Sequence, residues 1–303
     1  MASQTLDSRQ LDLFVHSRAV ILANDTITAM LAREAAQAEA CLGRLGAEVP
    51  DYAALNALKI LSHALSEWPP PTTSPAQIAD AVGRLEGEVR PAALAAMGST
   101  AEDFMRPFWH DLAHAAHAHA YDADFPQSFC AGLYLRCGDV WAAARTAESI
   151  PDWERNADAL LWLAVARYRI DELDTCLAPL MRLALLSPER LSIALGEIDD
   201  PLLQRDWNAF HLACDWLDPD DVTADACFPA WYLVEHPGVR LGVDDETSLP
   251  ATQAAQTFTA IARLLEVEKH GYNAALISSR GRLRDLNPEM FAFYMARRDV
   301  HRR

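Results

Sequence analysis

Several histidines are crowded into residues 109 to 119, and three of them have a spacing that suits metal chemistry. In a helix, His110, His114 and His117 lie on one face, because they are separated by four and three residues. Two histidines one helical turn apart are a common way of holding zinc. The segment is therefore a candidate site for a metal-dependent enzyme.

The alternative is a solvated histidine face on a helix that packs inward with its opposite face. That opposite face carries three apolar residues: Phe108, Leu112 and Ala116. Asp111 points about 100° away from His110 on a helix, and no second segment offers an obvious third ligand. We therefore predict that the chain binds no metal or other cofactor.

No other catalytic signature of high specificity is present in the sequence. It contains neither a G-x-S-x-G nucleophile motif nor a Walker-type glycine loop, nor a dinucleotide-binding glycine fingerprint. The acidic residues 215–221 lack the central glycine and the final glutamate of a calcium loop, so we expect a turn there. We predict that the protein is not an enzyme.

Close to the N-terminus, Gln10-Leu11-Asp12-Leu13-Phe14 has the pattern of a docking peptide. It resembles the pentapeptide with which many bacterial replication and repair proteins bind the β sliding clamp. The resemblance implies that Gln10 fills a small polar subsite, that Leu13 and Phe14 enter an apolar pocket, and that Leu11 adds packing. Two apolar anchors and one polar group suit an extended peptide. Alternatively, the same residues begin the first amphipathic helix.

Apolar residues recur at intervals of three and four along most of the chain, and period-two alternation is nearly absent, which predicts an all-α fold. We expect a tail at 1–16, a first helical hairpin region at 17–68 and a proline-rich linker at 69–75. A helical array at 76–237 and a C-terminal helical region at 238–303 follow. Within the first region, a helix is expected from Asp51 to about Ser66, and in the last region Asn287-Pro288 should begin the final helix.

Three segments resemble one another when Glu34, Asp139 and Glu172 are aligned as the starts of second helices. Small or apolar residues then follow at the same four offsets: Ala35, Ala38, Leu42, Leu45; Val140, Ala143, Ala147, Ile150; Leu173, Cys176, Leu180, Leu183. The spacing and the turn Gly138-Asp139 resemble the tetratricopeptide (TPR) repeat. This TPR-like resemblance implies an antiparallel helix-hairpin array, or α-solenoid, with a concave face that binds protein. A generic α-hairpin array has the same small contact residues.

Composition limits the partners and the compartment. The chain of 303 residues has a formal net charge of −17, so we expect no nucleic-acid partner except indirectly. The C-terminal end is nevertheless locally basic, with Arg280, Arg282, Arg284, Arg297, Arg298, Arg302 and Arg303. No apolar run is long enough for a membrane span, no secretory leader is evident, and the six scattered cysteines suggest a reducing compartment. We expect a cytoplasmic bacterial protein.

The sequence thus predicts a non-enzymatic helical-repeat adaptor that binds protein partners. Residues Gln10, Leu11, Leu13 and Phe14 are the candidate tether to the replication clamp. The two other hypotheses are a metal-dependent enzyme centred on the histidines and a structural helical subunit of a larger assembly.

Overall fold

The computed structural model describes residues 4–171, 173–214, 216, 222–239, 241 and 249–300. Side chains are described at 18–170, 173–214, 216, 223–239, 241 and 249–298. Throughout these residues the secondary structure is helical, without a strand, so the predicted all-α helical array is confirmed. The chain divides into two compact units, residues 1–139 and 140–303.

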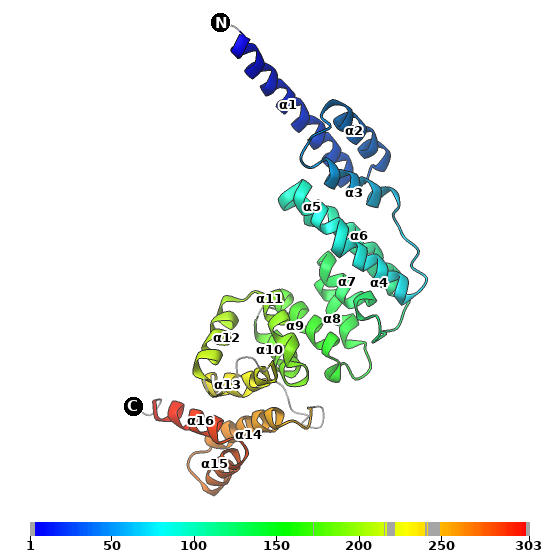
Figure 1. The fold of residues 1–303 in the computed structure, drawn as a ribbon. Coiled ribbons are helices and arrows are strands. Elements are labelled where there is room, and N and C mark those ends of the chain that lie inside the picture. The colour runs from blue at the N-terminus through cyan, green and yellow to red at the C-terminus, as the bar shows by residue number, and fades with distance from the viewer. Residues whose placement is uncertain are drawn as a thin grey trace. The chain divides into compact units, whose positions relative to one another are not determined.

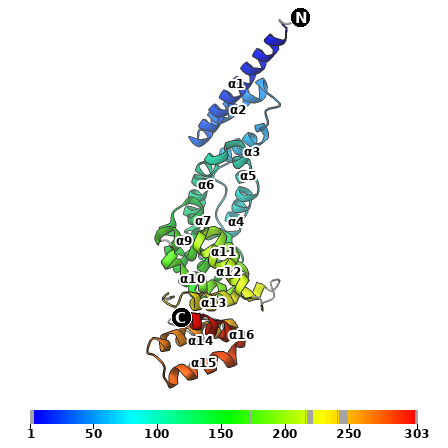
Figure 2. The same ribbon diagram turned by 90° about the vertical axis from the view of Figure 1, so that its left-hand side faces the viewer.

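The first unit contains seven α-helices among its described residues (Figures 1 and 2). These are α1 (Gln4–Leu31), α2 (Ala35–Glu48), α3 (Leu55–Ser66), α4 (Pro75–Arg84), α5 (Arg90–Met97), α6 (Ala101–Ala116) and α7 (Cys130–Cys137). A π-helical turn, Leu85–Val89, joins α4 to α5. Helices adjacent in sequence pack together at α1–α2, α2–α3, α5–α6 and α6–α7. The proline-rich residues 69–75 lie within this unit, where Ser74 caps α4 and Pro75 occupies its first turn.

The second unit contains nine α-helices among its described residues. They are α8 (Val140–Glu148), α9 (Ala157–Asp171), α10 (Leu173–Leu186), α11 (Leu191–Ile198), α12 (Pro201–Ala213), α13 (Phe228–Glu235), α14 (Gln253–Glu268), α15 (Ala274–Leu286) and α16 (Pro288–Val300). Helix α9 packs against α8, α10 and α11. It is apolar around most of its circumference, as expected of a helix covered on several sides.

The three aligned segments have the helix starts that the sequence predicts. Helices α2, α8 and α10 begin directly after Glu34, Asp139 and residue 172, respectively. The side chains four, eight and eleven positions after each alignment point are all buried: Ala38, Leu42, Leu45, Ala143, Ala147, Ile150, Cys176, Leu180 and Leu183. Gly138 adopts a left-handed conformation with φ of 86°, which ends α7. The shared residues are therefore the contact positions of helices.

Two helix starts differ from the sequence prediction. Helix α3 begins at Leu55 and not at Asp51, because hydrogen bonds from Tyr52 to Val49 and from Leu55 to Tyr52 place turns between α2 and α3. Helix α1 begins at Gln4, whereas we expected a tail through residue 16. Residues 4–31 contain neither glycine nor proline, so nothing in the sequence interrupts the helix.

The final helix follows its predicted signal. The amide of Met290 donates to the Asn287 side chain at 2.9 Å, and Pro288 is the first residue of α16. None of the six cysteines forms a disulfide; five are buried and Cys227 is half-buried. In the part of the chain that the structure describes, no helix is both long and apolar enough to cross a membrane.

Candidate functional site

Two of the three predicted histidines lie on an exposed face of α6, and His117 directly follows the last residue of this helix. His110, His114 and His117 are all exposed, while Phe108, Leu112 and Ala116 on the opposite face are buried. The rings of His110 and His114 stack with centroids 6.0 Å apart. Among the described residues, no three histidine, cysteine, aspartate or glutamate side chains come together to hold a metal ion.

The carboxylate nearest to these histidines is engaged in packing between helices. Asp111 accepts a hydrogen bond from the indole Nε1 of Trp68 at 2.8 Å and lies 3.6 Å from Nη2 of Arg33. The Arg33 guanidinium in turn lies over the Phe108 ring, 4.2 Å from its centroid, and Trp68 packs edge-on against the same ring. Partial burial lowers the pKa of Arg33, and Asp111 opposes that shift. Asp111 therefore links α6 to the segments that follow α1 and α3.

The candidate docking peptide lies in α1. The backbone of residues 10–14 falls within the helix Gln4–Leu31, but the side chains of Gln10, Leu11, Leu13 and Phe14 are outside the described residues. In both ribbon views the N-terminal turns of α1 extend past α2 and α3 (Figures 1 and 2). The structure thus places the peptide in a helix and leaves its docking role a prediction.

Most of the C-terminal arginines have carboxylate partners inside the second unit. Arg280 and Arg298 both pair with Glu268, at 3.3 and 2.9 Å. Arg297 pairs with Glu235 at 2.6 Å, and Arg284 pairs with Asp285 at 3.4 Å. Arg302 and Arg303 lie outside the described residues. Internal ion pairs therefore neutralise part of the local excess of positive charge seen in the sequence.

A surface groove that no sequence motif predicted crosses α8, α9 and α10. Its volume is about 430 Å³. The described lining residues are Trp141, Ala144, Arg145, Glu148, Arg167, Ile170, Asp174, Thr175, Ala178 and Leu241. Trp141 is 63% exposed, which is unusual for the largest aromatic side chain. One feature of the sequence indicated this residue. Trp141 stands beside the small buried contact residues of α8, and a tryptophan is too large for a close contact between two helices.

The walls of this groove carry both charges. Arg167 donates from Nη2 to Oε1 of Glu148 at 2.7 Å, which joins α9 to α8. Arg145 has no carboxylate partner among the described residues, and it lies one turn after Trp141 on α8. The groove thus offers an exposed aromatic ring and a cation on the same helix.

Comparison of the chain with family models, with curated proteins and with solved structures finds no match. A proposal for its function therefore depends on the side chains described above.

Proposed function

We propose that this protein is a non-enzymatic helical adaptor that binds a peptide segment of a partner protein in the groove across α8, α9 and α10. The observation that carries the proposal is the 63% exposure of Trp141 at the groove. A large aromatic ring has about 150–250 Å² of surface that can be buried. Since Trp141 is 63% exposed, covering it contributes about 2–4 kcal/mol at roughly 25 cal/mol per Å². Tryptophan and arginine are also the residues most enriched among the side chains that dominate binding energy.

The groove favours a segment with an apolar anchor next to an acidic residue. Trp141, Ala144, Ile170 and Ala178 supply apolar contact for the anchor. Arg145 then faces the acidic residue, because Arg167 is already engaged by Glu148 and the carboxylate of Asp174 disfavours an acidic residue at the α10 wall. Packing of the anchor gives affinity, and the charge pair fixes the direction of the peptide.

A peptide selection tests this part of the proposal. Random peptides displayed on phage are selected on the wild-type chain, and the enriched peptides are measured against Trp141→Ala and Leu212→Ala. Leu212 is 84% exposed on α12 and does not line the groove, so it is a matched control for loss of an exposed apolar side chain. We expect enriched peptides with an acidic residue beside an apolar one, bound by the Leu212 variant and lost by the Trp141 variant.

Two results would count against the groove. One is a selection that enriches no peptide over background. The other is a set of peptides that bind the Trp141→Ala variant as well as the wild type. Either result would favour a structural subunit whose contacts lie elsewhere on the chain.

The adaptor is further proposed to be tethered to the β sliding clamp through Gln10, Leu11, Leu13 and Phe14. Its support is the residue pattern of the peptide and its place near a helix end. Because the peptide binds in an extended form, the first turns of α1 must unwind on docking. Helix ends open at little free-energy cost compared with helix interiors. A tether of this kind raises the effective concentration of the adaptor at the clamp.

Binding to a purified β clamp tests the tether with two double variants on the same helix. Leu13→Ala with Phe14→Ala should abolish binding, because the two anchors supply most of the affinity. Val20→Ala with Ile21→Ala is the control, since these residues are 52% and 59% exposed. We expect this control to bind like the wild type, and both double variants to melt near the wild-type temperature. A large fall in melting temperature for the Leu13 and Phe14 variant alone would indicate a packed helix, and together with no clamp binding by the wild type it would overturn the tether.

A further inference from the structure

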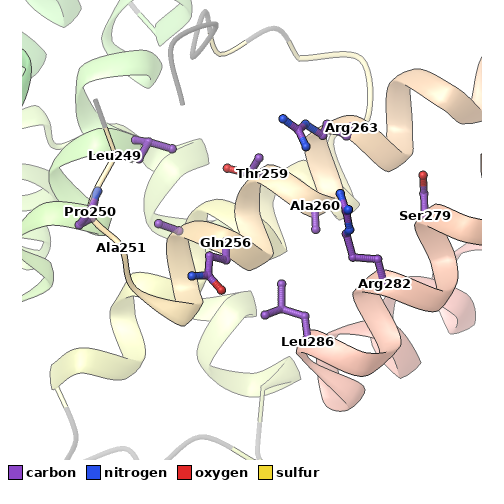
Figure 3. Close-up of a pocket in the computed structure, with 11 residues that line it drawn as sticks. Leu249, Pro250, Ala251, Gln256, Thr259, Ala260, Arg263, Ser279, Arg282 and Leu286 are labelled. Carbon is purple, nitrogen blue, oxygen red and sulfur yellow. The ribbon is translucent and has the colours of Figure 1, made fainter. Parts of the chain in front are cut away.

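A second cavity lies in the helical hairpin of α14 and α15, and its volume is about 590 Å³ (Figure 3). The two helices are antiparallel: the Gln253 side chain at the start of α14 donates to the backbone oxygen of Leu286 at the end of α15, at 2.8 Å. The segment that precedes α14 contributes a third side of the cavity. Cavities of this size are typical of sites for small ligands.

The lining contains both apolar and polar side chains. The apolar residues are Leu249, Pro250, Ala251, Ala255, Ala260 and Leu286. The polar residues are Gln256, Thr259 and Ser279, together with Arg263 and Arg282. In the close-up, Leu249 and Pro250 lie at one side of the cavity, whereas Arg282 and Ser279 lie at the other (Figure 3).

The charge of the lining has one sign. Among the described lining residues there are two arginines and no aspartate or glutamate, although the chain has a net charge of −17. The neighbouring arginines on α15, Arg280 and Arg284, pair with Glu268 and Asp285. In the described part of the chain, Arg282 has no carboxylate partner, and its exposed guanidinium lines the cavity.

We propose that this cavity binds an amphipathic anion, with its apolar chain against Leu249 and Pro250 and its anionic head at Arg282. A guanidinium binds a carboxylate or phosphate through two parallel hydrogen bonds. The hydroxyls of Thr259 and Ser279 also line the cavity and can donate further hydrogen bonds to the head group. This site is separate from the groove at Trp141, and its test does not depend on the adaptor function.

Isothermal titration with four simple probes tests the chemistry on the full chain, below the concentrations at which the probes form micelles. Octanoate and octyl phosphate carry a tail and an anionic head. Octylammonium carries the tail with the opposite charge, and acetate carries the head without the tail. We expect saturable binding of at least one of the two tailed anions, and no binding of octylammonium or acetate. The stronger of the two anions identifies a carboxylate or a phosphate head.

Three variants of α15 test the role of Arg282. Arg282→Gln should weaken binding of the tailed anion at least tenfold, and Arg282→Lys should restore part of it. Arg284→Gln is the matched control, because Arg284 is exposed on the same helix and does not line the cavity. Circular dichroism of each variant checks that the helices remain folded.

The proposal is overturned if octylammonium binds as tightly as octanoate, because apolar contact alone would then explain binding. It is also overturned if neither anion binds saturably. Equal binding by folded Arg282→Gln and by the wild type would likewise remove Arg282 as the head-group ligand.

Discussion

The carboxylate of Asp111 should matter more to stability than the histidines beside it on α6. Asp111→Ala removes the acceptor of the Trp68 indole, which lies at 2.8 Å, and the counter-charge of Arg33 at 3.6 Å. A hydrogen bond to a charged group contributes about 1.5–3 kcal/mol, and a partly exposed ion pair adds at most about 1 kcal/mol. The Asp111 side chain is 47% exposed, so water replaces part of what is lost. We therefore expect a loss of about 1.5–2.5 kcal/mol.

His114→Ala is the matched comparison, because His114 is also exposed and lies about one turn further along α6. Its ring contacts His110 and contributes little to the core, so the variant should stay within about 1 kcal/mol of the wild type. Asp111→Asn should lie between the two, because an amide oxygen still accepts from Trp68 while the charge opposite Arg33 is lost.

Thermal unfolding followed by circular dichroism measures the difference. A loss of 1 kcal/mol corresponds to a fall of about 2–4 °C for a chain of roughly this size, so Asp111→Ala should melt about 3–10 °C lower. Amide exchange should quicken in α3 and α6 of this variant, where the contact is lost. The reasoning is wrong if His114→Ala melts at or below the temperature of Asp111→Ala.

Three further results are expected in the second unit. Glu268→Ala should lower the free energy of unfolding in urea by about 3 kcal/mol, because it leaves Arg280 and Arg298 without a counter-charge. Asp285→Ala should lower it by less than about 0.5 kcal/mol, because the Asp285 side chain is 74% exposed. Equal losses for the two variants would contradict the burial argument. Burial raises the pKa of Tyr232 to about 12, so the stability that this tyrosine contributes is complete below pH 10 and is lost as the pH rises through 12. Tyr232→Phe should therefore remove one late step from the phenolate absorbance titration, and an unchanged titration would refute this. Burial also raises the pKa of the Cys176 thiol to about 12, so iodoacetamide should label Cys176 at pH 8 only after the chain unfolds. Labelling of Cys176 in the folded chain would show local opening.

Local signals in the sequence predicted much of the fold. Asn287-Pro288 marks the start of α16 because a side-chain cap and a proline act within one turn. The starts of α2, α8 and α10 follow from the repeated spacing of small residues, which are buried as helix contacts. The predicted helix start at Asp51 was wrong, because a residue that can cap a helix also suits a turn, and turns form there.

The side-chain partners of the candidate site could not be predicted from local sequence. Asp111 contacts Trp68 and Arg33, which belong to distant segments and have no spacing that relates them to α6. The pairing of Arg280 and Arg298 with Glu268 likewise depends on how three helices pack. For this reason the C-terminal end looked basic in the sequence, and Arg282 was not distinguished from its neighbours.

The central position of α9 has a consequence for how the second unit folds. Leu160, Leu163 and Ala166 of α9 are fully buried, and the helix packs against α8 and α10, its neighbours in sequence on both sides. Contacts between neighbouring segments close short loops and therefore form early in folding. Helix α9 is thus expected to belong to the folding nucleus, so truncations of its side chains should slow folding more than they speed unfolding. The amide groups of α9 should also be among the last in the unit to exchange with solvent.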